Sequence, residues 1–235
     1  MTLTNKVVLL TGATGGLGRT ILQTCLDRDA VVIAVARSHD SLKSLEAISS
    51  SAQLFPHAAD LSVESEVAGL IEKIRADHGK IDMLIHAAGG FKGGARLQDI
   101  TIEDWHTMLN LNLTSAFIII KHVLPLMIEN QGGNIIAISA TAALDLSVKK
   151  GAYVVSKSAL NTLIHIIAKE GKSHNIRANA IAPGIIKTKA NVQSMPDADS
   201  STWVSPEEIA EMILFLCSPA AKSITGNILS LPLRG

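Results

Sequence analysis

Tyr153 and Lys157 are the two side chains of this sequence best suited to moving a proton. Tyr153 is the single tyrosine of the chain, and Lys157 follows it by four residues, which places both on one face of a helix. A free phenol, with a pKa of about 10, is a poor acid or base at neutral pH, but a nearby ammonium lowers that pKa. The pair therefore predicts general acid–base catalysis. The competing explanation is a half-buried tyrosine beside a lysine that extends along the helix to water.

A glycine-rich turn near the start of the chain could bind phosphate. The run at 11–18, TGATGGLG, follows an apolar strand-like stretch and precedes a predicted helix. Glycines allow a tight turn that brings backbone N–H groups close to a pyrophosphate, and the N-terminus of the helix favours the anion. The turn predicts a dinucleotide cofactor, unless the glycines serve only helix–strand packing. The expected contacts are Gly12, Thr14, Gly16, Leu17 and Gly18.

Arg37 could decide which dinucleotide binds, because it directly follows the second predicted strand. A carboxylate at this corner would accept hydrogen bonds from the adenosine ribose and disfavour a 2′-phosphate. Here Ala36 and Arg37 occupy the corner, and Asp40 comes only later. A guanidinium suits a phosphate in charge and geometry, so the sequence favours NADP(H), with NAD(H) as the alternative. Arg37 could also be an ordinary solvated surface residue.

Apolar runs of strand length alternate with longer helical segments, and this alternation must position the polar residues. Such a pattern indicates parallel strands with helical crossovers, covered on both faces. We therefore predict an α/β fold with a doubly wound parallel sheet (Rossmann-type) in a single domain over 1–235. The predicted strands cover 6–10, 31–36, 53–59, 81–87, 133–139 and 176–181. The predicted helices cover 19–29, 41–49, 63–78, 102–130 (with a kink at Pro125) and 153–171. The irregular stretch 187–205 is expected to form a substrate lid.

Composition restricts the cellular setting and the partners. Lys+Arg and Asp+Glu both number 21, so nothing points to nucleic acid or an anionic membrane surface as a partner. No signal peptide is recognisable, and no stretch is expected to approach the roughly 18 apolar residues of a membrane span. Cys25 and Cys217 are predicted to be buried thiols of a cytoplasmic protein, with one disulfide as the alternative. The eight histidines lack metal-ligand spacing, so no metal is expected.

The spacing T-G-x-x-x-G-x-G resembles that of the short-chain dehydrogenase/reductase family, and the resemblance extends over nearly the whole chain. His86-Ala87-Ala88-Gly89 lies where this family usually shows N-x-A-G, and Tyr153 to Lys157 match Y-x-x-x-K. The resemblance implies a hydride-transferring enzyme in which Tyr153 is the general acid/base, Lys157 also holds the ribose, and Asn112 orders a relay water. It further implies cofactor contacts at Asp60, Leu61, Ala88, Gly89, Pro183, Gly184 and Thr188.

The resemblance also implies assembly. The segments 114–128 and 153–168 are apolar over much of their circumference, and helices of this kind are buried on every side. A doubly wound sheet covers only one side, and in the family the corresponding helices pair across subunits. We therefore expect a homo-oligomer, a tetramer or a dimer.

The sequence departs from the family pattern at one catalytic position. The family's catalytic serine lies thirteen residues before the tyrosine, which is Ala140 here, between Ser139 and Thr141. Adjacent side chains of an extended segment point to opposite faces, so neither neighbour replaces position 140 without a local bend. The stretch at 140–145 resembles dihydropteridine reductases, which also carry alanine there, whereas Arg37 argues against that subfamily.

These observations predict an NADP(H)-dependent oxidoreductase that acts on a small carbonyl, hydroxyl, or imine or quinonoid compound. Two alternatives stay open: a dihydropteridine reductase, and a cofactor-binding sensor or scaffold of the same fold with weak catalysis.

Overall fold

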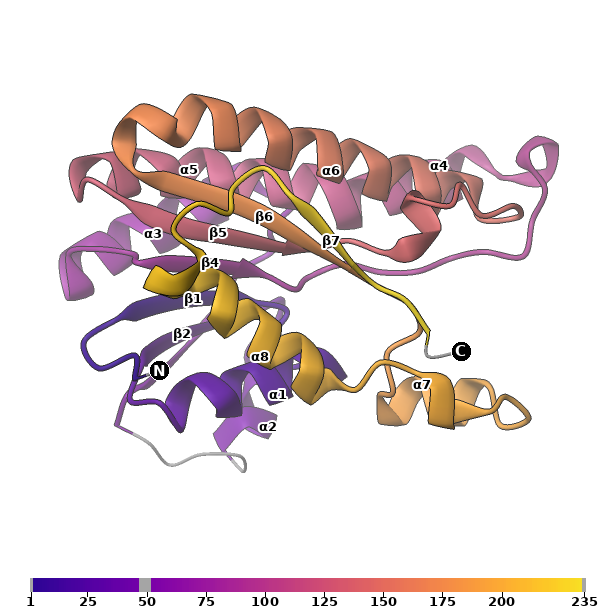
Figure 1. The fold of residues 1–235 in the computed structure, drawn as a ribbon, viewed down its shortest axis with the longest axis horizontal. Helices are drawn as coiled ribbons and strands as arrows, with labels where there is room; N and C mark the ends of the chain where they lie inside the picture. Colours follow the sequence, from indigo (N-terminus) through magenta and orange to yellow (C-terminus); the bar gives the residue numbers. More distant parts are fainter. Residues whose placement is uncertain (1, 47–51, 234–235) are drawn as a thin grey trace.

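Seven parallel strands form one sheet in the computed structural model, which describes residues 2–46 and 52–233. The strand order is β3-β2-β1-β4-β5-β6-β7 (Figure 1). The strands are β1 (Val7–Thr11), β2 (Val31–Ala36), β3 (Leu54–Ala58), β4 (Met83–His86), β5 (Gly133–Ile138), β6 (Ile176–Pro183) and β7 (Ile228–Leu231). The predicted α/β fold with a doubly wound parallel sheet is confirmed.

Helices cover both faces of the sheet, and the strands are apolar on both sides for that reason. The helices are α1 (Gly16–Leu26), α2 (His39–Glu46), α3 (Glu64–His78), α4 (Ile102–Leu109), α5 (Ser115–Glu129), α6 (Gly151–Glu170), α7 (Lys189–Ser194) and α8 (Pro206–Cys217). In β1, Val7 and Leu9 pack in one core with α3, α5 and α6, and Val8 and Leu10 pack in a second core with α1, α2 and α8. The sheet is therefore the middle of three layers.

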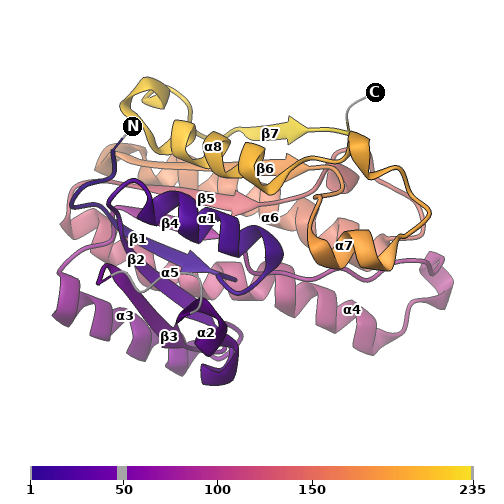
Figure 2. The ribbon, with the colours of Figure 1, turned by 90° about the horizontal axis from the view of Figure 1, so that it is seen from below.

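The chain reverses its direction of winding between β1 and β4, which are neighbours in the sheet although β2 and β3 separate them in sequence. In open α/β sheets the crevice at such a point, outside the carboxyl ends of the strands, is the usual ligand site. Figure 2 shows α7 at the end of the sheet toward which the strands point. Thr11 ends β1 opposite His86, which ends β4, so the glycine turn and the loop after β4 leave the sheet side by side.

The stretch Ile102–Glu129 is one continuous helical segment of 28 residues, but it is not regular throughout. Residues 110–114 form a π-helical turn between α4 and α5, and Pro125 lies inside α5. By length and composition alone this segment could cross a membrane, which corrects the expectation that no stretch approaches a membrane span. Half of its most apolar window is buried, and Ile119 and Val123 belong to the core against the sheet. It is a core helix of the α/β fold.

Most predicted elements coincide with observed ones to within a few residues. The exceptions are instructive. The stretch 187–205 is not wholly irregular, because it contains α7 and a short 3₁₀ turn at Ser200–Thr202. Beyond it, α8 and β7 have no counterpart among the predicted elements. The end of the helix predicted over 41–49 lies outside the described residues. Cys25 and Cys217 are both buried and free, as predicted for thiols.

Candidate functional site

The glycine turn has the backbone geometry that its sequence predicts. Gly12 has a φ of +69°, and a Cβ there would lie 2.7 Å from the backbone nitrogen of Ala88. At Gly18 a Cβ would collide with the carbonyl of Gly12, and at Gly16 it would lie 2.8 Å from Cβ of Thr188. Glycine is thus required because two other segments, the loop after β4 and the start of α7, approach the turn closely.

A cleft of about 320 Å³ opens beside this turn, at the carboxyl ends of the central strands. Its lining includes the following predicted cofactor contacts: Gly12, Thr14, Arg37, Asp60, Leu61, Ala88 and Gly89. Gly16, Leu17 and Gly18 begin α1 and shape the turn from behind without lining the cleft. The cleft also contains residues that the sequence did not single out, among them Ser62, Asn110, Leu111 and Ser115.

Arg37 and Asp60 lie at one end of the cleft and influence each other electrostatically. The Asp60 carboxylate accepts hydrogen bonds from the Ser62 side chain at 2.6 Å and from the Ser62 backbone at 2.9 Å. These hydrogen bonds, together with the Arg37 charge, hold the pKa of Asp60 below its usual value. This part of the cleft therefore contains a carboxylate held by two hydrogen bonds and a guanidinium whose positive charge helps to lower the pKa of that carboxylate.

Asn112 lies in the π-helical turn, fully buried, and its side chain joins the loop after β4 to α6. Its amide oxygen accepts from the Gly90 nitrogen at 3.0 Å, while its amide nitrogen donates to the Gly90 carbonyl and to the Ser156 hydroxyl, both at 3.1 Å. Single π-helical turns inside α-helices are often found at functional sites. The turn thus aims Asn112 away from α5 at the loop after β4 and at α6.

Tyr153 and Lys157 lie in the first half of α6, one turn apart. Lys157 is 5% exposed, and its ammonium donates to the Ile138 carbonyl at 2.7 Å. A Cβ at Gly89 would lie 2.7 Å from the Asn112 amide oxygen and 3.3 Å from the Lys157 ammonium. The absence of a side chain at Gly89 therefore leaves room for both the Asn112 amide and the Lys157 ammonium beside the loop after β4.

Burial dominates the titration of both groups. Desolvation raises the pKa of Tyr153 to about 12 and lowers the pKa of Lys157 to about 8. The sequence predicted the opposite direction for the phenol, a pKa lowered by the lysine. The structure corrects this expectation, since the largest influence on Tyr153 is its removal from water.

Ala140 lies against the tyrosine. Its backbone is extended, with φ −158° and ψ 147°, and its side chain clusters with Ala142, Val154 and Tyr153. Ser139 is buried, and its hydroxyl has no hydrogen-bond partner among the described residues. Because side chains alternate along an extended chain, Ser139 points to the face opposite Ala140. The geometry therefore leaves a methyl group at the position where the family has a serine hydroxyl.

His86 occupies a structural position inside the sheet rather than in a loop. It is fully buried at the end of β4, and its Nδ1 lies 3.0 Å from the Thr11 hydroxyl on β1. Burial, and next the Lys157 charge, lower the pKa of His86 to about 3, so the imidazole is neutral. His86 therefore joins the two strands that flank the switch point.

The chain after β6 returns to the glycine turn. Pro183 ends β6, and the Gly184 nitrogen donates to the Leu231 carbonyl at 2.8 Å. Thr188 caps α7 by accepting from the Asn191 nitrogen at 3.2 Å, and its methyl side packs beside Gly16. None of the three predicted contacts Pro183, Gly184 and Thr188 lines the cleft, and Thr188 lies beside the glycine turn.

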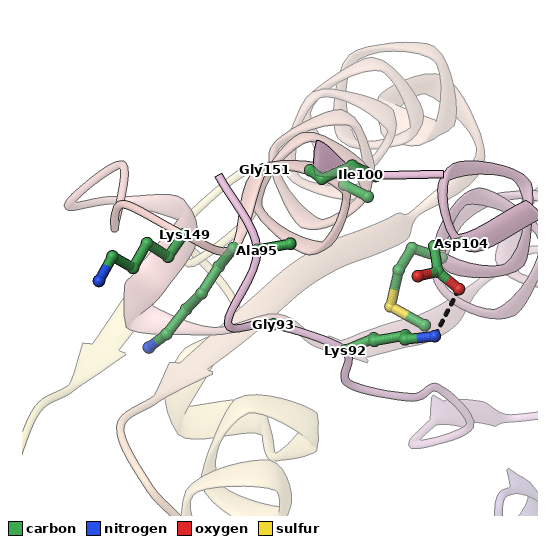
Figure 3. A pocket seen from close by; sticks show the side chains of 10 residues that line it. Lys92, Gly93, Ala95, Ile100, Asp104, Lys149 and Gly151 are labelled. Carbon is green, nitrogen blue, oxygen red and sulfur yellow. Dashed lines mark hydrogen bonds and ion pairs between the residues drawn. The ribbon is translucent and has the colours of Figure 1, made fainter. Parts of the chain in front are cut away.

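Phe91, which sequence reasoning missed, packs against Tyr153 and lies beside the turn before α6. Phe91 is 63% exposed, and its ring packs edge-on against Tyr153 with 5.0 Å between centroids. The Lys150 ammonium lies 5.9 Å from the Phe91 centroid. A small pocket bordered by this turn and by α4 is drawn in Figure 3.

Comparison with known proteins agrees with this geometry. The family model for short chain dehydrogenases matches residues 6–199. The 3-oxoacyl-[acyl-carrier-protein] reductase FabG of Thermotoga maritima is 31% identical over 242 residues, 98% of each chain. The 7alpha-hydroxysteroid dehydrogenase of Escherichia coli is 32% identical over 244 residues, 97% of this chain and 93% of the relative.

Solved structures agree over the same length. A short-chain type dehydrogenase/reductase from Mycobacterium ulcerans superposes with a TM-score of 0.91 at 27% identity, over 100% of this chain and 93% of that one. ElxO, solved with NADP bound, superposes with a TM-score of 0.91 at 27% identity over 97% of each chain. The chain therefore belongs to the short-chain dehydrogenase family of NAD(P)-dependent oxidoreductases.

Proposed function

We propose that this chain is an NADP(H)-dependent oxidoreductase that transfers a hydride to or from a small carbonyl, hydroxyl, or imine or quinonoid compound. The observation that carries the proposal is that the Asn112 amide and the Lys157 ammonium both lie close to Gly89, which lines the cofactor cleft, while Lys157 follows Tyr153 by one helical turn. A buried ammonium without a charge partner costs stability, and Lys157 has one described hydrogen bond, to the Ile138 carbonyl. Here it lies beside the predicted acid and the predicted cofactor site.

Tyr153 is the general acid of the proposed reaction. A bound nicotinamide supplies or accepts the hydride. In reduction, the Tyr153 hydroxyl donates its proton to the substrate oxygen or nitrogen, and with a pKa of about 12 it carries that proton at neutral pH. Lys157, with a pKa of about 8, is mostly charged at pH 7 and stabilises the phenolate that proton donation leaves.

Lys157 and Asn112 also have capacity for further partners. An ammonium has three donors, and the Ile138 carbonyl takes one, so donors are available for a ribose hydroxyl. The Asn112 amide oxygen accepts from Gly90 and keeps a second lone pair beside Lys157, where a relay water can bind. In this proposal Asn112 orders the water through which protons pass between the site and solvent.

The cofactor is proposed to be NADP(H), and the reason is Arg37. Its side chain lines the cleft at the corner after β2, and no carboxylate replaces it at that corner. ElxO, a neighbour in structure, was solved with NADP bound. A carboxylate does lie nearby at Asp60, but the hydrogen bonds from Ser62 fix its orientation. The proposed role of Asp60 is contact with the adenine.

Arg37→Asp tests the cofactor proposal. The wild type should bind NADPH more tightly than NADH, and the variant should lose or reverse that preference, because a charge-assisted contact contributes about 1.5–3 kcal/mol. Titration of both cofactors by calorimetry measures it, with Lys169→Asp at an exposed helix end as the charge control. Equal affinity of the wild type for both cofactors would leave Arg37 as a surface residue.

The first candidate for the substrate is a ketone or a secondary alcohol. The names of two relatives denote reduction of a 3-oxoacyl group and oxidation of a hydroxysteroid. Ala140 supplies the argument for the second candidate, an acceptor that is already activated, such as a quinonoid dihydropterin or an imine. Such an acceptor needs less hydrogen bonding to its oxygen or nitrogen in the transition state. Dihydropteridine reduction is therefore kept as the alternative.

A cofactor-binding sensor or scaffold would share this fold, and Ala140 is its only support. Oxidation of NADPH by the purified protein, measured against a panel of ketones, imines and quinonoid acceptors, separates the two functions. Turnover of one class supports the enzyme. No turnover of any acceptor in the panel, together with tight NADPH binding, would favour the sensor. We further propose that the protein is a cytoplasmic homo-oligomer, a tetramer or dimer, that engages neither nucleic acid nor membrane.

A further inference from the structure

The pocket of Figure 3 has more positive charge than its surroundings balance. Its lining combines apolar side chains, such as those of Ile100 and Met108, with Lys92, Asp104, Lys149 and Lys150. Asp104 is the only carboxylate among these lining residues, and Lys92 is bonded to it at 2.5 Å. Lys149 and Lys150 form no ion pair with any described residue.

The local excess is notable because the whole chain has equal numbers of acidic and basic residues. Figure 3 shows Lys92 reaching Asp104 on one side of the pocket and Lys149 extending on the other side. Two uncompensated ammonium groups therefore remain on the side formed by the turn before α6. The one carboxylate of that turn, Asp145, does not line the pocket, so an anion bound there would face the two ammonium groups.

Lys150 is connected to the proposed acid through one aromatic ring. Its ammonium lies 5.9 Å from the centroid of Phe91, whose ring lies 5.0 Å from that of Tyr153. Gly93 permits this arrangement, since a Cβ there would lie 2.8 Å from the Phe91 ring and 3.2 Å from the Lys150 side chain. The Phe91 ring thus lies between the Lys150 ammonium and the Tyr153 ring and contacts both.

The turn that presents these lysines is unusual in its backbone. Leu146 and Lys149 both have positive φ, +53° and +58°, although neither is glycine. The Lys149 carbonyl accepts a hydrogen bond from the Gly94 nitrogen at 2.7 Å, which ties this turn to the loop after β4. Left-handed conformations of such residues are disfavoured and persist where surrounding contacts enforce them, commonly at ligand sites.

We propose that Lys150 is a specificity-determining residue that selects substrates with an anionic group, such as a carboxylate, a few bonds from the reacting carbon. The positive charge of Lys149 adds to the attraction of the anionic group. The inference rests on the proposed function and goes beyond it, since it names a substrate class. The apolar part of such a substrate would lie against Phe91, and its anionic group would pair with the Lys150 ammonium. Packing of Lys150 on Phe91 without any ligand role is the outcome that the test must be able to reveal.

The test compares acids with their own esters. Acetoacetate, levulinate and 5-oxohexanoate, each beside its methyl ester, place the carboxylate at increasing distance from the carbonyl. For at least one pair, wild-type kcat/KM should favour the acid by about fivefold, the order expected of one exposed ion pair. Lys150→Gln should bring that ratio to about one, and Lys150→Arg should keep it. Lys172→Gln, an exposed lysine at the far end of α6, is the matched control and should also keep it.

The proposal is contradicted if wild-type kcat/KM is equal for every acid and its ester, or if Lys150→Gln retains the preference for the acid. These results leave the oxidoreductase function intact, because the esters are still reduced. If neither acids nor esters turn over, simple ketones are excluded as substrates of the proposed function, and binding decides the present inference instead. Hexanoate should then raise the melting temperature of the NADPH complex more than hexanamide in the wild type and in Lys150→Arg. An equal advantage of hexanoate in Lys150→Gln, or none in the wild type, would overturn it.

Discussion

Ala140 shows how one side chain can narrow the chemistry of a site. It packs against Tyr153 with a methyl group where a hydroxyl would donate to the developing charge on the substrate. Loss of one such donor typically reduces kcat by about 10²–10³-fold. Ser139 is buried on the opposite face, and Thr141 begins a 3₁₀ turn. The methyl group therefore predicts weak activity on simple ketones and better activity on activated acceptors.

Restoring the hydroxyl tests this prediction. Ala140→Ser should raise kcat/KM on a simple ketone by at least about tenfold and leave activity on a quinonoid dihydropterin unchanged or lower, because only the ketone needs the added donor. Initial rates with both acceptors measure the effect. Thr141→Ala and Ser139→Ala are the matched controls and should change little. A loss of about 10²–10³-fold in either control, with no gain from the serine, would show that a neighbour has replaced the missing donor.

Several residues of the site could not be identified from sequence because tertiary packing alone brings them there. His86 bonds to Thr11 only because β1 and β4 pair in a register that places them opposite each other. Phe91 reaches Tyr153 through a loop with no periodic pattern. By contrast, Tyr153 and Lys157 lie four residues apart on one helix, so their proximity follows from local geometry.

At the scale of elements, the sequence predicts what depends on local pattern and misses what depends on the edge of the sheet. The buried strands β1, β2 and β5 stand out as continuous apolar runs. β7 has four partly exposed residues at the sheet edge and no such run. α8 has a recognisable start, a capping box between Ser205 and Glu208 with Pro206 at its first turn, so it could have been predicted.

Backbone hydrogen bonds join the two ends of the segment 187–205. The Lys187 nitrogen donates to the Val204 carbonyl at 2.8 Å, the Val204 nitrogen donates to the Ile185 carbonyl at 3.0 Å, and Trp203 is buried. Within the segment, α7 is short, and Lys187 and Lys189 are exposed. Thr188 touches the glycine turn, so a cofactor bound at that turn would bear on this segment. We propose that it closes as a lid.

Limited proteolysis tests the lid. Trypsin should cut the free protein after Lys187 or Lys189, and NADPH should slow that cleavage at least about fivefold, because cleavage requires the exposed segment to open. Cleavage after Lys172, remote from the cleft, should not change and serves as the internal control. Mass spectrometry identifies the sites. If NADPH leaves the ratio of lid to control cleavage unchanged, the segment does not respond to the cofactor.

At the scale of the whole molecule, α5 and α6 carry apolar side chains that are exposed in the single chain. Phe117 and Ile128 on α5 are 49% and 40% exposed, and Val155 and Ile166 on α6 are 41% and 45% exposed. The other sides of these two helices already pack against the sheet. Exposed apolar surface of this extent, on adjacent helices, is typical of an interface between subunits.

Light scattering coupled to size exclusion tests the assembly. At micromolar concentration the wild type should have the mass of a tetramer or a dimer of the 24.8 kDa chain. Phe117→Glu combined with Val155→Glu should shift the mass toward the monomer, because each places a charge in an apolar interface. Phe215→Glu, an equally exposed aromatic on α8, distinguishes this interface from any other. A monomeric wild type would contradict the proposed assembly.

The measurement closest to the central claim is turnover of Tyr153→Phe with NADPH. The ring should still pack against Phe91 while the proton donor is gone, so NADPH affinity should stay within a few-fold and kcat should fall by at least about 10²-fold on every acceptor that the wild type reduces. Lys157→Ala should damage both affinity and kcat, since its ammonium is proposed to serve the phenol and the ribose. If Tyr153→Phe keeps most of the wild-type kcat, Tyr153 is not the acid and the proposed mechanism is wrong.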